Sequence, residues 1–117
     1  MRAQFDKIVI LDIRGNEICA IEEEMCKNLT HVKRLDARNN RIKEITPHIK
    51  AMMMLQALRL DSNLLEELPI GIGELYYLEE LTFADNKVTE VPPALFAKLN
   101  DSLKILIMAD NKIKHLP

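Results

Sequence analysis

The sequence predicts an α/β repeat protein, a solenoid of about five turns with a short parallel sheet on its concave side and helical or 3-10 turns on its convex side. Asparagine recurs at intervals of 24, 23, 23 and 25 residues, at Asn16, Asn40, Asn63, Asn86 and Asn111. Apolar residues hold fixed positions around each of these asparagines, and a second apolar set follows at helical spacing. Self-similarity at a fixed period of this length is the signature of a stacked-repeat fold.

The repeated apolar positions lie eight, five and three residues before each asparagine, and two and five residues after it. All 25 of these positions are apolar in a chain that is 48% hydrophobic. In chain order they are Ile8, Leu11, Ile13, Ile18 and Ile21; Val32, Leu35, Ala37, Ile42 and Ile45; Leu55, Leu58, Leu60, Leu65 and Leu68; Leu78, Leu81, Phe83, Val88 and Val91; and Leu103, Leu106, Met108, Ile113 and Leu116. The repeats therefore start near residues 8, 32, 55, 78 and 103 of a single domain, and residues 1–7 are expected to form a rudimentary N-terminal cap.

The alternation before each asparagine, as in Leu58-Arg59-Leu60, is the period-two pattern of a short strand with one buried face. One such strand cannot bury its apolar side alone, so the units are expected to stack into a parallel sheet. The asparagine follows where the chain turns a corner and backbone groups lose their partners in the sheet. Because its amide both donates and accepts hydrogen bonds, we interpret the five asparagines as a structural ladder.

Each of the first four units then carries a second pair of apolar residues, three or four positions apart. These pairs are Met25 and Leu29, Ile49 and Met52, Ile72 and Leu75, and Leu95 and Leu99. The spacing indicates a helical or 3-10 turn on the outer, convex side of the solenoid. The prolines near the start of these segments fit this interpretation, because proline suits the first turn of a helix and excludes a strand.

The pattern L-x-x-L-x-L-x-x-N-x-L at this period resembles the leucine-rich repeat family over essentially the whole chain. Prolines directly after Leu68, Val91 and Leu116 make it similar to the intracellular subclass with a unit of about 23 residues. The second unit has its proline one position later, after Thr46, and the first unit has none. The resemblance implies a protein-interaction module that serves as a scaffold or regulatory adaptor. It also implies partners such as small GTPases, phosphatases, and cytoskeletal or ciliary proteins.

Composition narrows the classes of partner. The chain has 16 Lys+Arg against 18 Asp+Glu, a net charge of -2, and so lacks the basic excess that binding to a phosphate backbone needs; no nucleic acid is expected. No apolar run approaches the ~20 residues that cross a bilayer, so no membrane insertion is expected.

The apolar run at residues 8–11 is too short for a secretion signal, and two cysteines are too few for a disulfide framework. A reduced, cytoplasmic protein is the expectation.

The sequence shows no catalytic constellation, which would need a nucleophile with a base, paired carboxylates, a metal cluster or a phosphate-binding loop. The three histidines, His31, His48 and His115, fall in different units without companions at ligand spacing. Cys19 follows an apolar position and is interpreted as a small buried hydrophobe, and Met52 as a core residue. We therefore expect no enzyme activity, no cofactor and no metal site in this chain.

Partner binding is expected on the concave face, where outward positions alternate with buried strand residues. The candidate residues are Asp12, Arg14, Arg34, Asp36, Arg38, Arg59, Asp61, Glu80, Thr82, Ile105 and Ile107, and the remaining outward positions are Ile10, Ala57, Ala84 and Ala109. The sign pattern inverts at the third unit, so Asp36 is expected to face Arg59, and Arg38 to face Asp61. These charges either only pair with one another, which contributes little stability, or form a recognition patch. Ile105 and Ile107 are large aliphatic residues that further repeats or a partner would cover.

The ends of the chain suggest a further alternative. Solenoid ends normally need polar caps, yet the last unit stops at Leu116-Pro117, so an uncapped C-terminus within a larger protein or assembly is expected. The alternative hypothesis is that the chain is the recognition segment of a larger enzyme, such as a kinase, cyclase or ubiquitin ligase, with the catalytic domain outside this chain. A secreted receptor ectodomain ranks third, because it requires a signal peptide and the cysteine-rich caps that the resemblance leads one to expect.

Overall fold

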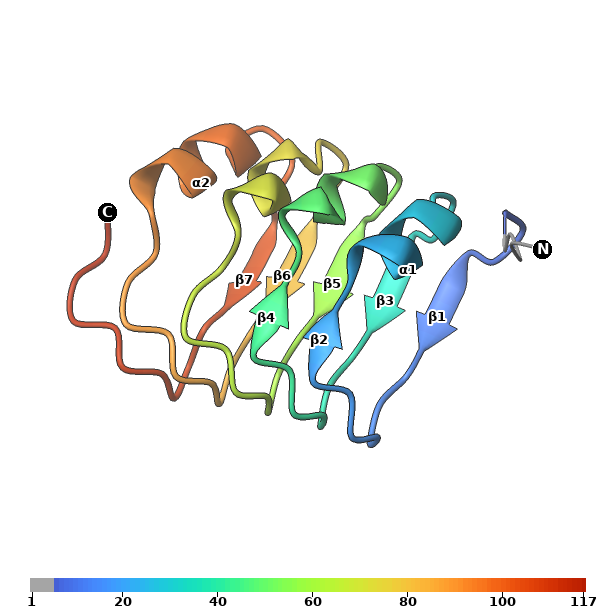
Figure 1. The fold of residues 1–117 in the computed structure, drawn as a ribbon. Coiled ribbons are helices and arrows are strands. Elements are labelled where there is room, and N and C mark those ends of the chain that lie inside the picture. The colour runs from blue at the N-terminus through green and yellow to red at the C-terminus, as the bar shows by residue number, and fades with distance from the viewer. Residues whose placement is uncertain (1–5) are drawn as a thin grey trace.

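The computed structural model describes residues 6–117 and shows a solenoid of five turns (Figure 1). Each turn contributes one strand to a parallel sheet with the order β1-β3-β5-β6-β7. The strands are β1 (Ile10–Asp12), β3 (Arg34–Asp36), β5 (Ala57–Arg59), β6 (Glu80–Thr82) and β7 (Ile105–Ile107). The predicted parallel sheet, with one strand per unit, is confirmed. We call the outward side of this sheet the concave face.

The register of the sheet follows the asparagine frame. The residues five positions before successive asparagines are partners across the sheet: Leu11, Leu35, Leu58, Leu81 and Leu106. A slip of one residue would turn every buried leucine to the outside, and for this reason the apolar pattern alone fixes the register.

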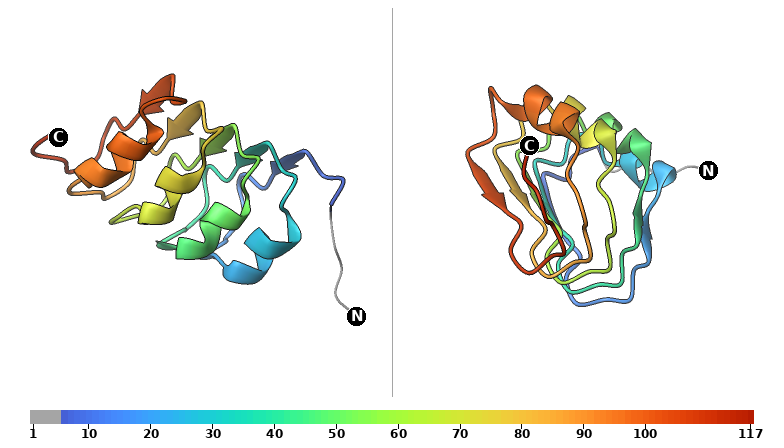
Figure 2. Two further views of the ribbon diagram at one scale, coloured as in Figure 1. Left: turned by 90° about the horizontal axis from the view of Figure 1, so that it is seen from above. Right: turned by 90° about the vertical axis from the view of Figure 1, so that its left-hand side faces the viewer.

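Short helices carry the chain back in each of the first four units. They are α1 (Glu23–Asn28), the 3-10 segments η1 (Pro47–Ala51) and η2 (Ile70–Glu74), and α2 (Pro93–Leu99). Seen from above, the helices run along one side of the molecule and the five-stranded sheet along the other (Figure 2). Proline occupies the first turn of η1 and α2, and the Thr46 hydroxyl accepts a hydrogen bond from the backbone N–H of His48 at 3.1 Å at the start of η1. The predicted helical or 3-10 turns are confirmed.

The helical side of the core holds a cysteine where the sequence suggested methionine. Cys26, Ile49, Ile72 and Leu95 occupy equivalent positions in successive units and are fully buried, whereas Met25 is only half-buried. The prediction for Met25 is therefore displaced by one residue. The prediction that Cys19 is buried is wrong: Cys19 is exposed, and its thiol lies 3.5 Å from the carbonyl oxygen of Glu17.

Two further short strands were not predicted. β2 (Ala20–Ile21) and β4 (Glu44–Ile45) pair in parallel and lie across the core from the five-stranded sheet (Figure 2). Each ends on the isoleucine at the fifth repeated position, Ile21 in the first unit and Ile45 in the second. The backbone pairing of adjacent turns therefore continues on this side of the solenoid as well.

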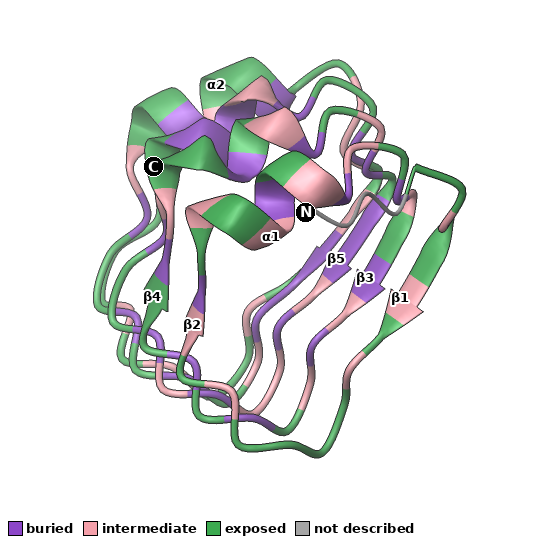
Figure 3. Ribbon diagram, turned by 45° about the vertical axis from the view of Figure 1, so that its right-hand side comes forward, coloured by how far each residue is buried: buried purple, intermediate pink, exposed green. Residues whose placement is uncertain are grey.

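One apolar core runs through all the units, and the three middle units bury it best. Their repeated apolar positions are all buried, whereas Ile8, Leu11, Leu106 and Met108 in the end units are half-buried (Figure 3). Of the expected cap at residues 1–7, residues 1–5 lie outside the described part of the chain, and Asp6 and Lys7 form an exposed turn. No helix within residues 6–117 is both long and apolar enough to cross a membrane.

The asparagines form the predicted structural ladder. The Asn63 side-chain N–H groups donate to the carbonyl oxygens of Ala37 at 3.1 Å and Leu60 at 2.9 Å, one in each of two adjacent units. The Asn63 carbonyl oxygen accepts from the backbone N–H of Ile42 at 3.0 Å. Asn40, Asn86 and Asn111 repeat this arrangement. Asn16, in the first described unit, is exposed and bonds only within its own unit.

The residue before each ladder asparagine has a left-handed backbone. These residues are Gly15, Asn39, Ser62, Asp85 and Asp110, with φ angles of 69°, 58°, 57°, 54° and 56°. This conformation is costly for most side chains and is best tolerated by glycine, asparagine and aspartate, which fill four of the five positions. The turn after every strand is thus specified by two consecutive residues rather than by the asparagine alone.

Candidate functional site

The strands hold two rows of predicted binding residues in register across the concave face. Arg14, Arg38 and Asp61 follow two residues after the ends of β1, β3 and β5. The expectation that all of these positions are exposed is wrong at two of them. Ala57 and Thr82 are only 7% and 5% exposed. Burial also changes along the sheet: Figure 3 shows more buried residues in β3 and β5 than in β1.

Asp36, on β3, is the centre of a cluster of charged side chains on the concave face. Its carboxylate lies 2.7 Å from a guanidinium nitrogen of Arg38, 3.7 Å from one of Arg14 and 3.8 Å from one of Arg59. The Asp36 side chain is 14% exposed. Three cations from three successive units therefore converge on one carboxylate, and the expected juxtaposition of Asp36 and Arg59 is present.

Two of the three arginines near Asp36 also pair with a second carboxylate. Arg14 makes a two-nitrogen contact with Asp12, with N–O distances of 2.9 Å, and Arg59 donates to Glu80 at 2.5 Å. We call these six residues the concave network: Asp12, Arg14, Asp36, Arg38, Arg59 and Glu80. Paired guanidinium and carboxylate groups of this kind are the stronger class of side-chain hydrogen bond.

The expected pair between Arg38 and Asp61 does not form. Arg38 instead donates to Asp36, two residues earlier on the same face of its own unit. Asp61 accepts from the Thr82 hydroxyl at 2.7 Å and from the backbone N–H of Ala84 at 2.7 Å. Asp61 and Thr82 thus connect the third and fourth units instead of presenting free polar groups.

The network shifts the pKa values of its own members. Partial burial by itself raises the pKa of Asp36, but hydrogen bonds from Arg38 and the charges of Arg38 and Arg14 outweigh it, so that the pKa lies below its ordinary value. Hydrogen bonds from Arg14 likewise lower the pKa of Asp12. The hydrogen bond to Glu80 raises the pKa of the Arg59 guanidinium. All of these groups are therefore charged at neutral pH.

Two shallow hollows, each of about 220 Å³, flank the middle of the concave face. Arg34, Ala57 and Arg59 line both of them. The short side chain of Ala57 forms the floor, since neighbouring positions of this row carry larger residues. Large exposed aliphatic residues stand at the two ends: Ile10 is 62% exposed at one, and Ile105 and Ile107 are 46% and 47% exposed at the other.

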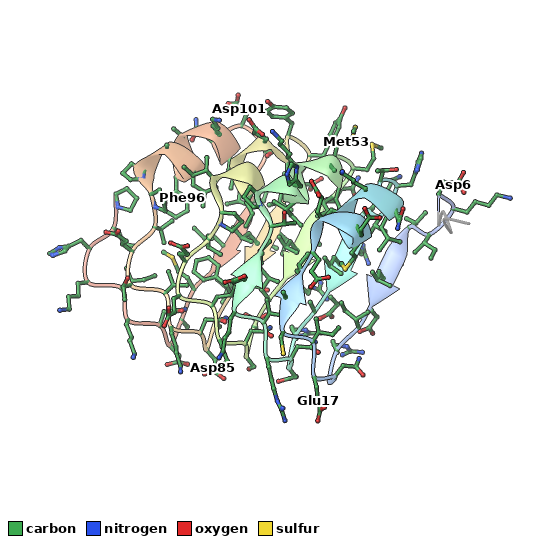
Figure 4. All side chains as sticks on the ribbon, viewed as in Figure 1. Asp6, Glu17, Met53, Asp85, Phe96 and Asp101 are labelled. Atoms are coloured by element: carbon green, nitrogen blue, oxygen red, sulfur yellow. The ribbon has the colours of Figure 1, made fainter. Side chains whose placement is uncertain are left out.

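An apolar patch that the sequence pattern did not predict lies on the edge where the helices lead into the strands. Met53, Tyr76 and Tyr77 are 56%, 70% and 59% exposed there. Figure 4 shows Met53 and Asp101 on this edge, and Glu17 and Asp85 on the opposite one. The available signal was the position of Tyr76 and Tyr77 between the buried residues Leu75 and Leu78, where no inward-facing position remains.

A wider depression lies away from the concave face. It measures about 690 Å³ and is lined by β2, β4, the starts of η1 and η2, and residues beside them, including Glu22, Glu44, Glu67 and Ile70. Within residues 6–117 no group of three His, Cys, Asp or Glu side chains could hold a metal ion. Burial, with a smaller effect of the Glu23 charge, raises the pKa of the Cys26 thiol to about 11, which leaves it protonated and unreactive.

Comparison with known proteins identifies similar chains. A family model described as "Leucine rich repeat" matches residues 6–65. The chain is 27% identical over 118 residues to the Protein flightless-1 homolog of Caenorhabditis elegans, in a match that covers 79% of this chain and 9% of that protein. The chain therefore spans less than a tenth of the length of this relative.

Several solved structures share the fold, among them the following two. A leucine-rich repeat protein of Leptospira interrogans superposes with a TM-score of 0.77 at 27% identity, covering 86% of this chain and 25% of the other. The leucine-rich repeat ectodomain of the Arabidopsis thaliana membrane receptor kinase GASSHO1/SCHENGEN3, solved in complex with CASPARIAN STRIP INTEGRITY FACTOR 2, superposes with a TM-score of 0.74 at 28% identity. That match covers 92% of this chain and 13% of the other.

Proposed function

The chain belongs to the leucine-rich repeat family, and we propose that it is a non-catalytic protein-interaction module that binds a protein partner mainly through its concave face. Repeat solenoids commonly use their extended concave surface for binding. The GASSHO1/SCHENGEN3 ectodomain, which has the same fold, was solved bound to another molecule. This likeness supports a binding role for the present chain.

The observation that carries the proposal is the concave network. Because Arg14, Arg38 and Arg59 all converge on Asp36, their side chains are oriented before any partner arrives. A surface that is ordered in advance loses less conformational entropy on association. Fixed charges also set specificity and association rate, and exposed Ile10 and Ile105 add apolar area beside them.

The role that we propose is that of a scaffold or regulatory adaptor in the cytoplasm. The proline that follows the fifth apolar position, as at Pro69 and Pro92, supports the intracellular subclass. Small GTPases, phosphatases and cytoskeletal or ciliary proteins are the partner classes that this assignment favours.

A pair of matched variants tests the concave face. Proteins captured from cell lysate by the wild-type chain would be identified, and the binding of each purified partner measured by calorimetry. The concave variant carries Ile105→Ser and Ile107→Ser; the control carries Ile70→Ser and Tyr76→Ser, which remove two comparably exposed apolar residues elsewhere. Loss of at least ~10-fold in affinity with the concave variant, and less than about twofold with the control, is the expected result.

The opposite pattern would contradict the proposal. A partner that binds the concave variant normally and loses affinity for the Ile70→Ser, Tyr76→Ser variant uses the helical side of the solenoid. Far-UV circular dichroism and thermal unfolding of both variants separate lost binding from lost folding, and all four substituted side chains are about half exposed or more.

A second candidate is the recognition segment of a larger enzyme. The observation that favours it is the match to the ectodomain of a receptor kinase, of which this chain covers 13%. Sequencing of the parent transcript on both sides of the region tests this candidate directly, because a kinase, cyclase or ubiquitin ligase domain in the same reading frame is the expected finding.

A further inference from the structure

The two hollows of the concave face contain one cation more than they contain carboxylates. Five cationic side chains and four carboxylates line them, in a chain whose net charge is -2. Each carboxylate has a cation partner within 4 Å, in the pairs Arg14–Asp12, Arg38–Asp36, Arg59–Glu80 and Lys104–Glu79. Arg34 is the remaining cation.

Arg34 makes no ion pair or side-chain hydrogen bond with any residue in the described part of the chain, residues 6–117. It is exposed, and it lies in register between Ile10 on β1 and Ala57 on β5. The small Ala57 leaves open space on one side of the guanidinium, whereas Arg59, in the next row, is held by Glu80 at 2.5 Å. The free cation therefore borders both hollows.

We propose that Arg34 binds a carboxylate side chain of an extended segment of the partner protein, and that aliphatic residues of the same segment cover Ile10 and Ile105. This inference rests on the proposed docking through the concave face and adds its chemistry. One unpaired guanidinium matches one carboxylate in charge, and its planar donors suit carboxylate geometry.

The spacing of the strands defines the segment further. Ile10 is one strand away from Arg34 and Ile105 is three strands away, which corresponds to roughly 5 Å and 14 Å at the usual strand separation. An extended chain advances about 3.3 Å per residue, and alternate side chains point the same way. The segment therefore has an aliphatic residue about two positions from the acidic residue on one side, and another about four positions away on the other.

The nearby carboxylates do not oppose this arrangement. Asp12 and Asp36 contact arginines at distances of 2.9 Å and 2.7 Å, and Glu80 contacts Arg59. Each of these charges is compensated within the protein, so an incoming carboxylate meets the field of the uncompensated Arg34. A doubly charged phosphate would exceed the single unpaired cation, and for this reason we favour a carboxylate.

A displayed library of random ten-residue peptides, selected on the 117-residue chain, provides the probe. The expected consensus is one Asp or Glu with aliphatic residues at the two spacings above. A synthetic consensus peptide should lose at least about tenfold in affinity on Arg34→Gln and less than about twofold on Arg41→Gln, an exposed arginine of the same unit that pairs with Glu17 instead. Changing the peptide's Glu to Gln should weaken binding to wild type about as much, and should not weaken binding to Arg34→Gln further.

Other outcomes separate the two proposals. If the selected peptides share no acidic residue, prefer phosphoserine over Glu by tenfold or more, or bind Arg34→Gln as tightly as wild type, the carboxylate inference is wrong. Docking through the concave face survives in that case if the Ile105→Ser, Ile107→Ser variant loses the peptides. If that double variant binds them normally, the proposed function itself fails. A library without any binder also overturns recognition of an extended acidic segment.

Discussion

Single asparagine side chains hold adjacent units of this solenoid together, and the position of each asparagine determines how much it contributes. Asn63 is buried and makes hydrogen bonds to the backbone of two units, whereas Asn16 is exposed and bonds only within its own. Leaving buried backbone groups without partners is costly, about 1–3 kcal/mol for each group.

We therefore expect Asn63→Ala to lower the free energy of unfolding by about 3 kcal/mol, and Asn16→Ala by less than about 1 kcal/mol. Urea titrations followed by circular dichroism measure both values. Equal losses for the two variants would show that the hydrogen bonds between units add nothing beyond those within a unit.

Acid should weaken the fold through Asp36. The pKa of Asp36 is lowered in the folded protein, so its ionised form stabilises the fold at pH values above its ordinary pKa of about 4, and this stabilisation is lost as the pH falls through the lower folded value. Asp36→Asn should therefore reduce the difference in unfolding free energy between pH 7 and pH 3. Glu66→Gln, at an exposed position, is the control. An unchanged pH dependence in Asp36→Asn would contradict the role of this carboxylate.

The interaction partners of individual side chains were the least predictable feature from sequence. The apolar frame placed Asp36 opposite Arg59, and this proximity is present. It could not decide whether Arg38 would reach Asp61 in the next unit or Asp36 in its own unit, because both lie within range of a long, flexible side chain. The repeated Asp-x-Arg of the first two units was the unused signal, since residues two apart on a strand share a face.

The helical segments differ in kind according to the length of their units. The two units with 23 residues between asparagines contain the 3-10 segments η1 and η2, and the units of 24 and 25 residues contain α1 and α2. A 3-10 helix rises about 2.0 Å per residue against about 1.5 Å for an α-helix, so a shorter unit spans the same arc by adopting the tighter helix.

The positions of the five strands in the large sheet were predictable, whereas β2, β4 and the helix boundaries were not, and the reason is physical. Each strand must match its neighbours residue by residue, so five copies of the pattern reinforce one another. The helical segments only need to place two apolar side chains inward. Cys26 could thus take the position assigned to Met25 without disturbing the frame.

The contact between η1 and η2 is close enough to exclude a side chain at Gly71. A Cβ atom there would collide with the carbonyl oxygen of Pro47 and lie 3.3 Å from Cγ2 of Ile49. Gly71→Ala should lower the unfolding free energy by about 1–3 kcal/mol, measured by urea denaturation. Gly73→Ala is the control: the nearest atoms, Cβ and Cδ of Lys98, lie 3.2 Å from a Cβ there and would need to move by only a few tenths of an ångström, so a smaller loss is expected. A larger loss at Gly73 would mean that the two helices separate easily.

The whole molecule should be most stable in its middle. The end units keep half-buried apolar residues, whereas the middle units bury theirs completely, and each unit contacts mainly its neighbours. Local opening should therefore begin at the ends.

Amide hydrogen exchange tests this gradient with two matched hydrogen bonds. The backbone N–H of Leu60 donates to the backbone carbonyl oxygen of Thr82 at 2.7 Å, in the middle of the sheet. The backbone N–H of Ile13 donates to the backbone carbonyl oxygen of Asp36 at 2.8 Å, in the first unit. Because the two bonds have nearly the same length, a difference in rate reports the stability of the units. We expect Leu60 to exchange at least ~100-fold more slowly. Equal rates would indicate that all five units open together.

The asparagine ladder also has a mechanical consequence. Each rung ties a turn only to the one before it, so a force applied to the two ends would load the rungs in series rather than together. The weakest rung, next to an end, would yield first. Each turn released would lengthen the tether by roughly 75 Å, as 23 residues change from a stacked layer to an extended chain. The solenoid would then lengthen in steps under tension, one turn at a time.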